Sequence, residues 1–304
     1  MIDARIKLRH IACFLEVASR AGFGRAADAL HLTQPAVSRA ISELEEVLGA
    51  PLFERGRGGA SLTPEGLAFR AHAGAAMAEL GRGVDILRQA GAGAGDEVRV
   101  GVLPTVAARI MPRAVQQAKA AGLCAVITIE AGPNGWLLDQ LKQGHLDLVV
   151  GRLAEPQIMM GLAFEHLYRE PIVCVARPGH PAATGQPASF AEIARHTLII
   201  PARGSIIRPQ IDRLFILAGI ARIGERIETV EPQFARAYVR QTDAVWIISH
   251  GVVAGDLDEG LLVHLPLSTS VSGGPVGLTT RAGLVPSPAA ERLIRAVRET
   301  ALSV

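Results

Sequence analysis

Cysteine is scarce in this sequence. Cys13, Cys124 and Cys174 are the only three in 304 residues, and they lie far apart. An odd count without a C-x-x-C pair argues against a disulfide framework and against a zinc site. An isolated cysteine on an apolar segment is a small buried hydrophobe more often than a redox sensor. We therefore expect a reduced compartment and no bound metal.

Long apolar runs are also missing. No stretch approaches the roughly 18 apolar residues of a membrane span, and the N-terminal decapeptide MIDARIKLRH has no signal-peptide core. With 49% hydrophobic and 20% charged residues, the chain can bury a large core and form two or three domains. These features predict a soluble, cytoplasmic protein without membrane contact.

Motifs for catalysis and for cofactor binding are absent as well. The nine histidines have no metal-ligand spacing, and no G-x-S-x-G elbow or Walker-type phosphate loop is present. The GAGAG run at 91–95 precedes a strand, the reverse of a dinucleotide-binding fingerprint, and is typical of a flexible linker. We expect no cofactor and no enzymatic activity, although α/β clefts also host enzymes.

The excess of positive over negative residues in this sequence is small. The net charge is +2, and residues 1–60 contain eight bases against seven acids. Bulk attraction to DNA is therefore weak. Any affinity for DNA must come from individually placed arginines and from two half-sites bound at once.

What the sequence does contain is a helix-turn-helix pattern within residues 24–49. An amphipathic helix precedes it, and a short second helix places small apolar residues inward. Thr33 is expected to cap a third helix that has Pro35 in its first turn. The residues expected to face the core are Ile11, Phe14, Leu15 and Ala18, then Ala26, Ala27 and Leu30, then Val37, Ile41, Leu44 and Leu48.

The outward side of the third helix has the chemistry of a DNA-reading surface. Arg pairs with guanine, Gln with adenine, and Ser with a base or a phosphate, chiefly from the first turns of a recognition helix. An ordinary three-helix surface with incidental polar residues is the alternative. The candidate DNA-binding residues on this helix are Thr33, Gln34, Pro35, Ser38, Arg39 and Ser42, with Glu45 and Glu46 facing solvent or a neighbouring helix.

Residues 51–62 predict a two-stranded wing with a turn at Gly58 and Gly59. Arg55 and Arg57 are its phosphate or minor-groove candidates, the alternative being a solvated loop with incidental charges. Thr63 and Pro64 then start a helix that runs to about residue 90. Its glycines weaken it, so we expect its seam to pack against a partner subunit. The seam residues are Phe69, Ala73, Ala76, Leu80, Val84 and Leu87.

Residues 8–66 closely resemble the LysR-type transcriptional regulators. The match consists of AADALHLTQPAVSRAISELE, then LGAPLFER, then LTPEG. The resemblance implies an α+β protein with an N-terminal winged helix-turn-helix, a long linker helix used for dimerisation, and a two-lobed α/β effector domain like the periplasmic binding proteins. The expected boundaries are 1–62 for the DNA-binding domain, 63–90 for the linker helix, 91–95 for the hinge and 96–304 for the effector domain.

From residue 96 onward, strands and helices alternate in a pattern typical of a parallel sheet. Lobe 1 is expected over 96–171 and 268–304, and lobe 2 over 172–267. The expected strands are 98–103, 125–130, 146–150, 172–176, 197–200, 223–229, 244–248 and 276–280, with helices at 105–121, 133–143 and 288–302. Crossover strands between the lobes would leave a cleft.

Ligands of such sheets bind beyond the strand ends, where helix N-termini present free N–H groups to anions. Two loops fit this position, and both are followed by a predicted helix. The alternative for Thr105 and Ser205 is simple helix capping, and for Phe234 it is core packing. The candidate effector-binding residues are Pro104, Thr105, Arg152, Arg203, Gly204, Ser205 and Phe234, with Arg208 as a further source of charge.

Within the family, the N-terminal IDARIKLRH and the DLVVGRL run at 147–153 resemble the branch with regulators of protocatechuate catabolism and of galactose-binding-protein expression. This implies an aromatic or a sugar-derived acid as inducer. The expected partners are double-stranded DNA, a small carboxylate effector and a second copy of the chain, as homodimer or homotetramer, with RNA polymerase a further candidate. An α/β enzyme with an appended DNA-binding domain and a purely architectural DNA protein are the alternatives.

Overall fold

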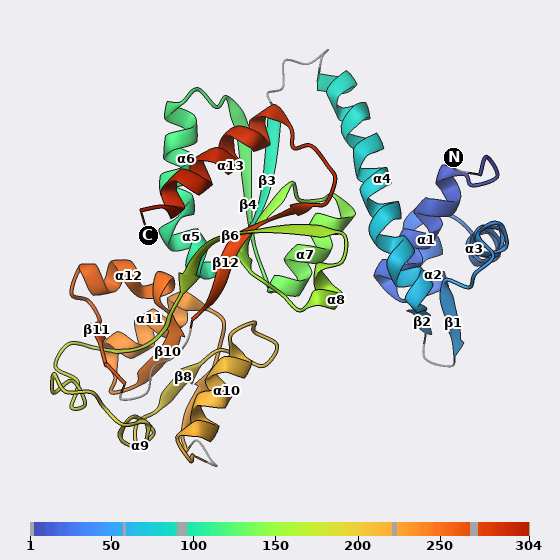
Figure 1. The fold of residues 1–304 in the computed structure, drawn as a ribbon. Helices are drawn as coiled ribbons and strands as arrows, with labels where there is room; N and C mark the ends of the chain where they lie inside the picture. The colour runs from blue at the N-terminus through green and yellow to red at the C-terminus, as the bar shows by residue number, and fades with distance from the viewer. Residues whose placement is uncertain (1–2, 57–58, 90–95, 221–223, 268–272, 304) are drawn as a thin grey trace. The chain divides into compact units, whose positions relative to one another are not determined.

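The computed structural model describes residues 3–56, 59–89, 96–220, 224–267 and 273–303 (Figure 1). The chain divides into two compact units, one of residues 1–94 with 139–146 and one of residues 95–138 with 147–304. Among the described helices, none has both the length and the hydropathy that crossing a lipid bilayer requires.

The first unit begins with three helices around one core. These are α1 (Leu8–Arg20), α2 (Phe23–Leu30) and α3 (Gln34–Leu48). The expected inward residues are buried or partly buried in that core, where Phe14 is fully buried and packs against Phe53 and Phe69. The apolar periodicity of the sequence therefore predicted both the helices and their inner faces.

Thr33 occupies the N-cap position of α3, but its hydroxyl caps nothing, contrary to expectation. An N-cap side chain bonds the N–H of the second or third helical residue. The second is Pro35, which has no N–H, and the N–H of Ala36 donates to the carbonyl of Thr33 itself at 3.0 Å. The Thr33 side chain is thus left exposed at the start of α3.

A hairpin follows, made of β1 (Phe53–Gly56) and antiparallel β2 (Gly59–Leu62), as the wing pattern predicted. We expected Glu45 to face solvent or a neighbouring helix, but the structure gives it a different role. Its carboxylate accepts the backbone N–H groups of Leu52 at 2.7 Å and Phe53 at 3.2 Å. The third helix therefore holds the start of the hairpin directly.

The helix α4 (Pro64–Gln89) closes this unit. The Thr63 hydroxyl accepts the N–H of Gly66 at 2.9 Å and donates to the carbonyl of Pro51 at 2.7 Å, so the predicted cap is present. Phe69 and Ala73 pack into the core of the unit. In contrast, Leu80 is 51% exposed and Val84 is 46% exposed.

The first turn of α4 passes so close to Leu52 that only glycine fits at position 66. A Cβ there would lie 2.1 Å from the Leu52 carbonyl oxygen, which is backbone and cannot rotate away. We expect Gly66→Ala to lower the free energy of unfolding by about 1–3 kcal/mol, as overpacking does. Gly81→Ala is the matched control on the same helix, since a Cβ at Gly81 meets nothing within 4 Å.

The control should instead gain about 0.5–1 kcal/mol from helix propensity. Urea titrations of both variants, followed by circular dichroism, measure the two effects with opposite predicted signs. Equal stability of the two variants would contradict the close approach of α4 to Leu52.

The second unit contains two five-stranded sheets. The first has the order β4-β3-β5-β12-β6, and helices α6 and α13 pack on it (Figure 1). Its strands are β3 (Asp96–Val102), β4 (Ala125–Ala131), β5 (Leu148–Arg152), β6 (Leu162–Glu170) and β12 (Gly274–Arg281). Its helices are α5 (Pro104–Arg109), α6 (Met111–Ala120), α7 (Asn134–Gln143), α8 (Pro156–Met159) and α13 (Pro288–Ala301).

The second sheet has the order β11-β7-β10-β8-β9 and is covered on both faces, by α9 and α10 and by α11 and α12. Its strands are β7 (Ile172–Ala176), β8 (Leu198–Ile200), β9 (Arg226–Glu228), β10 (Val245–Ser249) and β11 (Val263–His264). The helices are α9 (Phe190–Ile193), α10 (Arg208–Leu217), α11 (Pro232–Gln241) and α12 (His250–Asp258).

The chain passes from the first sheet to the second between β6 and β7, and returns between β11 and β12. The predicted alternation of strands and helices is present, but the sheets are mixed and not purely parallel. The strand β12 runs antiparallel to β5 and β6, and β7 runs antiparallel to β10. The expected helix at 105–121 is two helices, α5 and α6, which meet at Ile110 before Pro112.

Candidate functional site

The outward residues predicted on α3 are all exposed. Gln34, Pro35, Ser38, Arg39 and Ser42 lie on its open side while Val37 and Leu44 are fully buried. Within the described residues, Arg39 makes no ion pair and no side-chain hydrogen bond, so its guanidinium is available to a base edge. Other arginines of the unit are already held, since Arg20 pairs with Glu16 and Arg5 with Asp3.

A hollow of about 490 Å³ lies beside the third helix. Gln34, Ser38 and Ser42 line it, at a spacing of four residues that places them on one stripe of α3. Its other walls come from the first turn of α2 and from the hairpin, including Gly22, Gly24, Phe53 and Glu54. The polar residues of α3 thus divide between this hollow and a fully open side that carries Pro35 and Arg39.

The wing arginines are less completely placed. Arg55 lies on β1, paired across the hairpin with Ala60, but its side chain is not among those described. Arg57 and Gly58 lie outside the described residues. Contact of either arginine with DNA stays a prediction.

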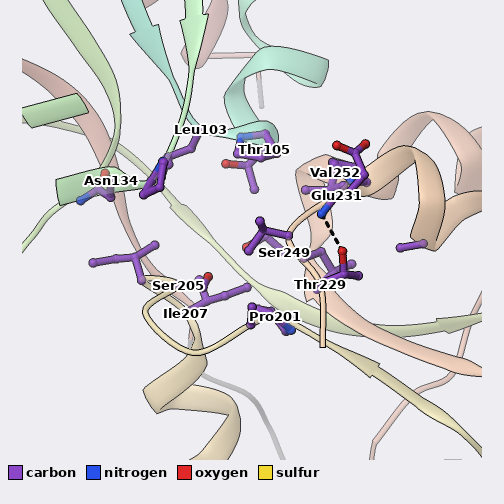
Figure 2. Close-up of a pocket in the computed structure, with 18 of the residues that line it drawn as sticks. Leu103, Thr105, Asn134, Pro201, Ser205, Ile207, Thr229, Glu231, Ser249 and Val252 are labelled. Carbon is purple, nitrogen blue, oxygen red and sulfur yellow. Dashed lines mark hydrogen bonds between the residues drawn. The ribbon is translucent and has the colours of Figure 1, made fainter. Parts of the chain in front are cut away.

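A cavity of about 500 Å³ lies between the two sheets of the second unit. Figure 2 shows Leu103, Thr105 and Asn134 on one side of it and Pro201, Ser205 and Ile207 on another. Ser249 and Val252 complete the view, together with Thr229, whose hydroxyl accepts the N–H of Glu231 at 3.0 Å. Most of the remaining wall is apolar, with Trp246 and Ile248 on β10 and Ile206 before α10.

Arg152 supplies the buried cation of this cavity. It ends β5 with only 3% of its surface exposed. One guanidinium nitrogen, Nη2, donates to the Ser249 hydroxyl at 2.9 Å and to the Glu170 carbonyl at 3.3 Å, while Nη1 has no partner among the described residues. Burial lowers the pKa of Arg152, and the nearby Glu170 opposes that shift. The site therefore contains a desolvated positive charge with donor capacity to spare.

Two neutral side chains on the same side of the cavity also have unused polar atoms. The Thr105 hydroxyl is buried and makes no hydrogen bond within the described structure, so it does not cap α5. The Asn134 side chain donates through Nδ2 to the Arg152 carbonyl at 3.2 Å, and its Oδ1 has no partner there. Buried polar atoms without partners are costly and commonly mark a binding site.

The helix N-termini around the cavity are not equivalent. On the lobe 2 side, Glu231 already accepts the N–H of Gln233 in α11, and Glu170 accepts the N–H of Gly251 in α12. Thr105 and Asn134, which both line the cavity, lie at the starts of α5 and α7. Neither of these helices has an acidic residue in its first turn. A helix N-terminus attracts an anion, and a carboxylate already bound there cancels the attraction. The positive end of the cavity is therefore the lobe 1 side.

The structure corrects two of the expected contacts. Phe234 does not line the cavity, because α11 buries Ala235 and turns Phe234 outward, where it stacks on Tyr238. Ser205 does line it but does not open a helix. Its N–H bonds the Ala202 carbonyl at 3.1 Å, and α10 begins only at Arg208.

The other predicted effector residues divide as follows. Pro104, Thr105 and Arg152 line the cavity from the first sheet, and Arg203 and Gly204 line it from the loop after β8. Arg208 is instead committed to Asp212, Glu228 and the Pro201 carbonyl. The sequence reasoning missed Asn134, Trp246 and Ser249, although Asn134 follows a predicted strand just as Thr105 does.

The cysteines lie apart from both sites. Cys13 and Cys174 are buried, as expected of small hydrophobes, whereas Cys124 is exposed. Burial raises the pKa of the Cys174 thiol to about 12. Because the thiolate is the reactive form, this burial disfavours oxidation of Cys174.

Two family profiles match the chain. The profile described as the bacterial regulatory helix-turn-helix protein of the lysR family matches residues 8–67. The profile described as the LysR substrate binding domain matches residues 91–302. Together they match residues in both units of the structure.

Similar proteins match over nearly the whole length. The transcriptional regulator PcaQ of Agrobacterium fabrum is 46% identical over 301 residues, which cover 99% of this chain and 97% of PcaQ. The uncharacterised regulator YdcI of Escherichia coli is 34% identical with the same coverage. Full-length LysG of Corynebacterium glutamicum, solved with its effector Arg, shares the fold with a TM-score of 0.64 at 17% identity, over 98% of each chain.

Proposed function

This chain belongs to the LysR family of bacterial transcriptional regulators, and from that premise we propose that its effector is a small aromatic carboxylate bound in the cavity of the second unit. The chain is a DNA-binding, effector-responsive regulator and not an enzyme. The family assignment thereby removes the alternatives of an α/β enzyme and of an architectural DNA protein.

One observation carries the proposal of an acid. Arg152, Thr105 and Asn134 line the cavity together, the starts of α5 and α7 have no acid in their first turns, and no buried acid is among the described lining residues. Each helix start favours an anion by a few tenths to about 1 kcal/mol, and a hydrogen bond from a cation adds about 1.5–3 kcal/mol. A neutral ligand would gain much less there.

The other walls support an aromatic body. Trp246, Ile207 and Val252 offer apolar surface to the cavity, and the volume of about 500 Å³ suits a small molecule. The resemblance of the sequence to the branch with protocatechuate-pathway regulators, and its similarity to PcaQ, favour an aromatic acid over a sugar-derived one. We propose that the regulated genes serve aromatic catabolism, in the cytoplasm where the DNA lies.

For the DNA-binding side, we propose that the outward residues of α3 read the major groove and that the wing arginines contact the backbone. We further propose that residues 1–62 form the DNA-binding domain, 63–90 the dimer helix, 91–95 the hinge and 96–304 the effector domain. The exposed Leu80 and Val84 on α4 support dimerisation through that helix.

The Thr105 hydroxyl provides a test with two readouts of opposite sign. In the free protein, Thr105→Val removes a buried hydroxyl without a partner, so thermal stability should stay equal or rise slightly. Affinity for the acid should fall about tenfold, since one hydrogen bond to a carboxylate is lost. DNA binding without ligand should be unchanged.

Calorimetric titration of aromatic acids, each compared with its neutral amide, measures the affinities. Ser205→Ala removes the hydroxyl that the loop after β8 contributes to the cavity, and it should lose less than about threefold because it leaves the positive end intact. Wild-type affinity in Thr105→Val, or tighter binding of the amides or of a neutral sugar, would reject the proposed carboxylate site.

A further inference from the structure

The two segments that connect the sheets of the second unit approach each other closely where Gly273 meets Glu170. Glu170 ends β6 just before the first crossover, and Gly273 precedes β12 at the end of the second. A Cβ on Gly273 would lie 2.0 Å from the Glu170 carbonyl oxygen, so the two backbones pass with no room for a side chain. The end of the first crossover and the end of the second are therefore held close together at this contact.

Arg152 lies against this contact and reaches both lobes. It belongs to the first sheet, whereas the Ser249 hydroxyl that accepts its Nη2 at 2.9 Å belongs to the end of β10 in the second. The same nitrogen donates to the Glu170 carbonyl. Nη1 lies 2.5 Å from the position that a Cβ on Gly274 would take. The guanidinium is thus enclosed by both crossovers and by lobe 2.

Glu170 completes the arrangement with a second connection to lobe 2. Its side chain is fully buried, and its Oε1 accepts the Gly251 N–H in the first turn of α12 at 2.7 Å. A buried charge that loses its partner is strongly destabilised. Opening the lobes would take Ser249 away from Arg152, which would keep only the Glu170 carbonyl, and would take the Gly251 N–H away from the Glu170 carboxylate.

We propose that Arg152, Glu170, Ser249 and Gly251 form an interlobe latch that fixes the opening of the cleft before any effector binds. The part of this inference that concerns the ligand rests on the proposed function: Ser249 is a positioning residue that aims Arg152 at the acid. The effector then enters a site that is already formed, and the closure of an open cleft is not required.

Two variants loosen the latch in different ways. Ser249→Ala removes the lobe 2 acceptor of Arg152, and Ser249→Thr restores a hydroxyl. Gly274→Ala pushes on the flexible tip of Arg152 from a position that does not itself line the cavity. Gly255→Ala is the matched control on α12, where a Cβ meets nothing within 4 Å.

The first measurement needs no ligand. Spin labels at Arg295 on α13 and Glu259 at the end of α12, both exposed, report the distance between lobes in the full chain with exposed Cys124 replaced by Ser. Labelled subunits are diluted with unlabelled ones so that distances within one chain dominate. We expect a narrow distribution in the wild type, Ser249→Thr and Gly255→Ala, and a broader one in Ser249→Ala and Gly274→Ala.

The second measurement is calorimetric titration with the aromatic acids. Affinity should fall about tenfold in Ser249→Ala and in Gly274→Ala, and should be retained in Ser249→Thr and Gly255→Ala. Unchanged distance distributions in both loosening variants would overturn the latch, whatever the acids do. If no acid binds the wild type, the proposed function fails, while the ligand-free distances still decide the latch.

Discussion

Arg39→Ala weakens binding to the operator by about 1–3 kcal/mol for each half-site and relaxes base preference at one position in each. The reason is geometric. Arg39 is exposed on the first turns of α3, one turn after Pro35, and no acid holds its guanidinium within the described residues. A dimer on two half-sites loses the contact twice, so total affinity should fall by more than about one order of magnitude.

Both effects can be measured by selecting binding sites from random DNA, first with the wild-type chain and then with the variant. Arg20→Ala is the matched control, because Arg20 is an exposed arginine of the same unit that already pairs with Glu16. Arg57→Ala should weaken all sequences alike and flatten the salt dependence, as loss of a phosphate contact does. Unchanged selectivity in Arg39→Ala would show that α3 does not read bases through this residue.

Leu80→Asp breaks the dimer. The Leu80 side chain is half exposed on a 26-residue helix whose earlier apolar residues, Phe69 and Ala73, already pack in their own unit. Burying a leucine contributes about 1.5–3 kcal/mol, and a symmetric interface loses this twice while also burying two charges. The dimer dissociation constant should rise by about two orders of magnitude or more.

Sedimentation equilibrium over a range of concentrations measures that constant, and Leu80→Met is the control because it conserves volume and hydrophobicity. Binding to paired half-sites should fall in parallel, while binding to a single half-site should be unchanged. An intact dimer in Leu80→Asp with full operator affinity would place the subunit interface elsewhere.

The DNA-binding unit follows closely from the sequence because its helices have clear amphipathic periodicity. The residues expected inside α1, α2 and α3 are inside, and those expected outside α3 are outside. The errors concern side-chain hydrogen bonds. Whether Thr33 caps α3 depends on which amides are free, and whether Glu45 reaches Leu52 depends on how the chain turns after the helix.

The second unit was less predictable than the first. The strand β6 was missed, since its pairing with β12 shifts at Val276 and Gly277 and the apolar alternation changes phase there. Strand direction does not follow from periodicity either, so the antiparallel β12 and β7 were unexpected. A local sequence pattern predicts where a strand lies, but it does not predict which strands pair with it or in which direction.

The candidate effector site shows the same limit. Thr105 and Arg152 were found because each lies at or near the end of a predicted strand. Ser249 and Glu170 were missed because they approach Arg152 only through the crossovers, 97 and 18 residues away in sequence. The prediction that Phe234 faces the cavity missed the helical phase by one position, because the neighbouring Ala235 is the residue that faces inward.

The most direct test of an acid-responsive regulator is a footprint of the full chain on a selected operator, with an aromatic acid or its neutral amide added. We predict that an acid changes the protected pattern, that its amide does not, and that Thr105→Val needs about tenfold more acid for the same change. A pattern that no acid alters, or that the amide alters equally, would contradict control of DNA binding through the positive end of the cavity.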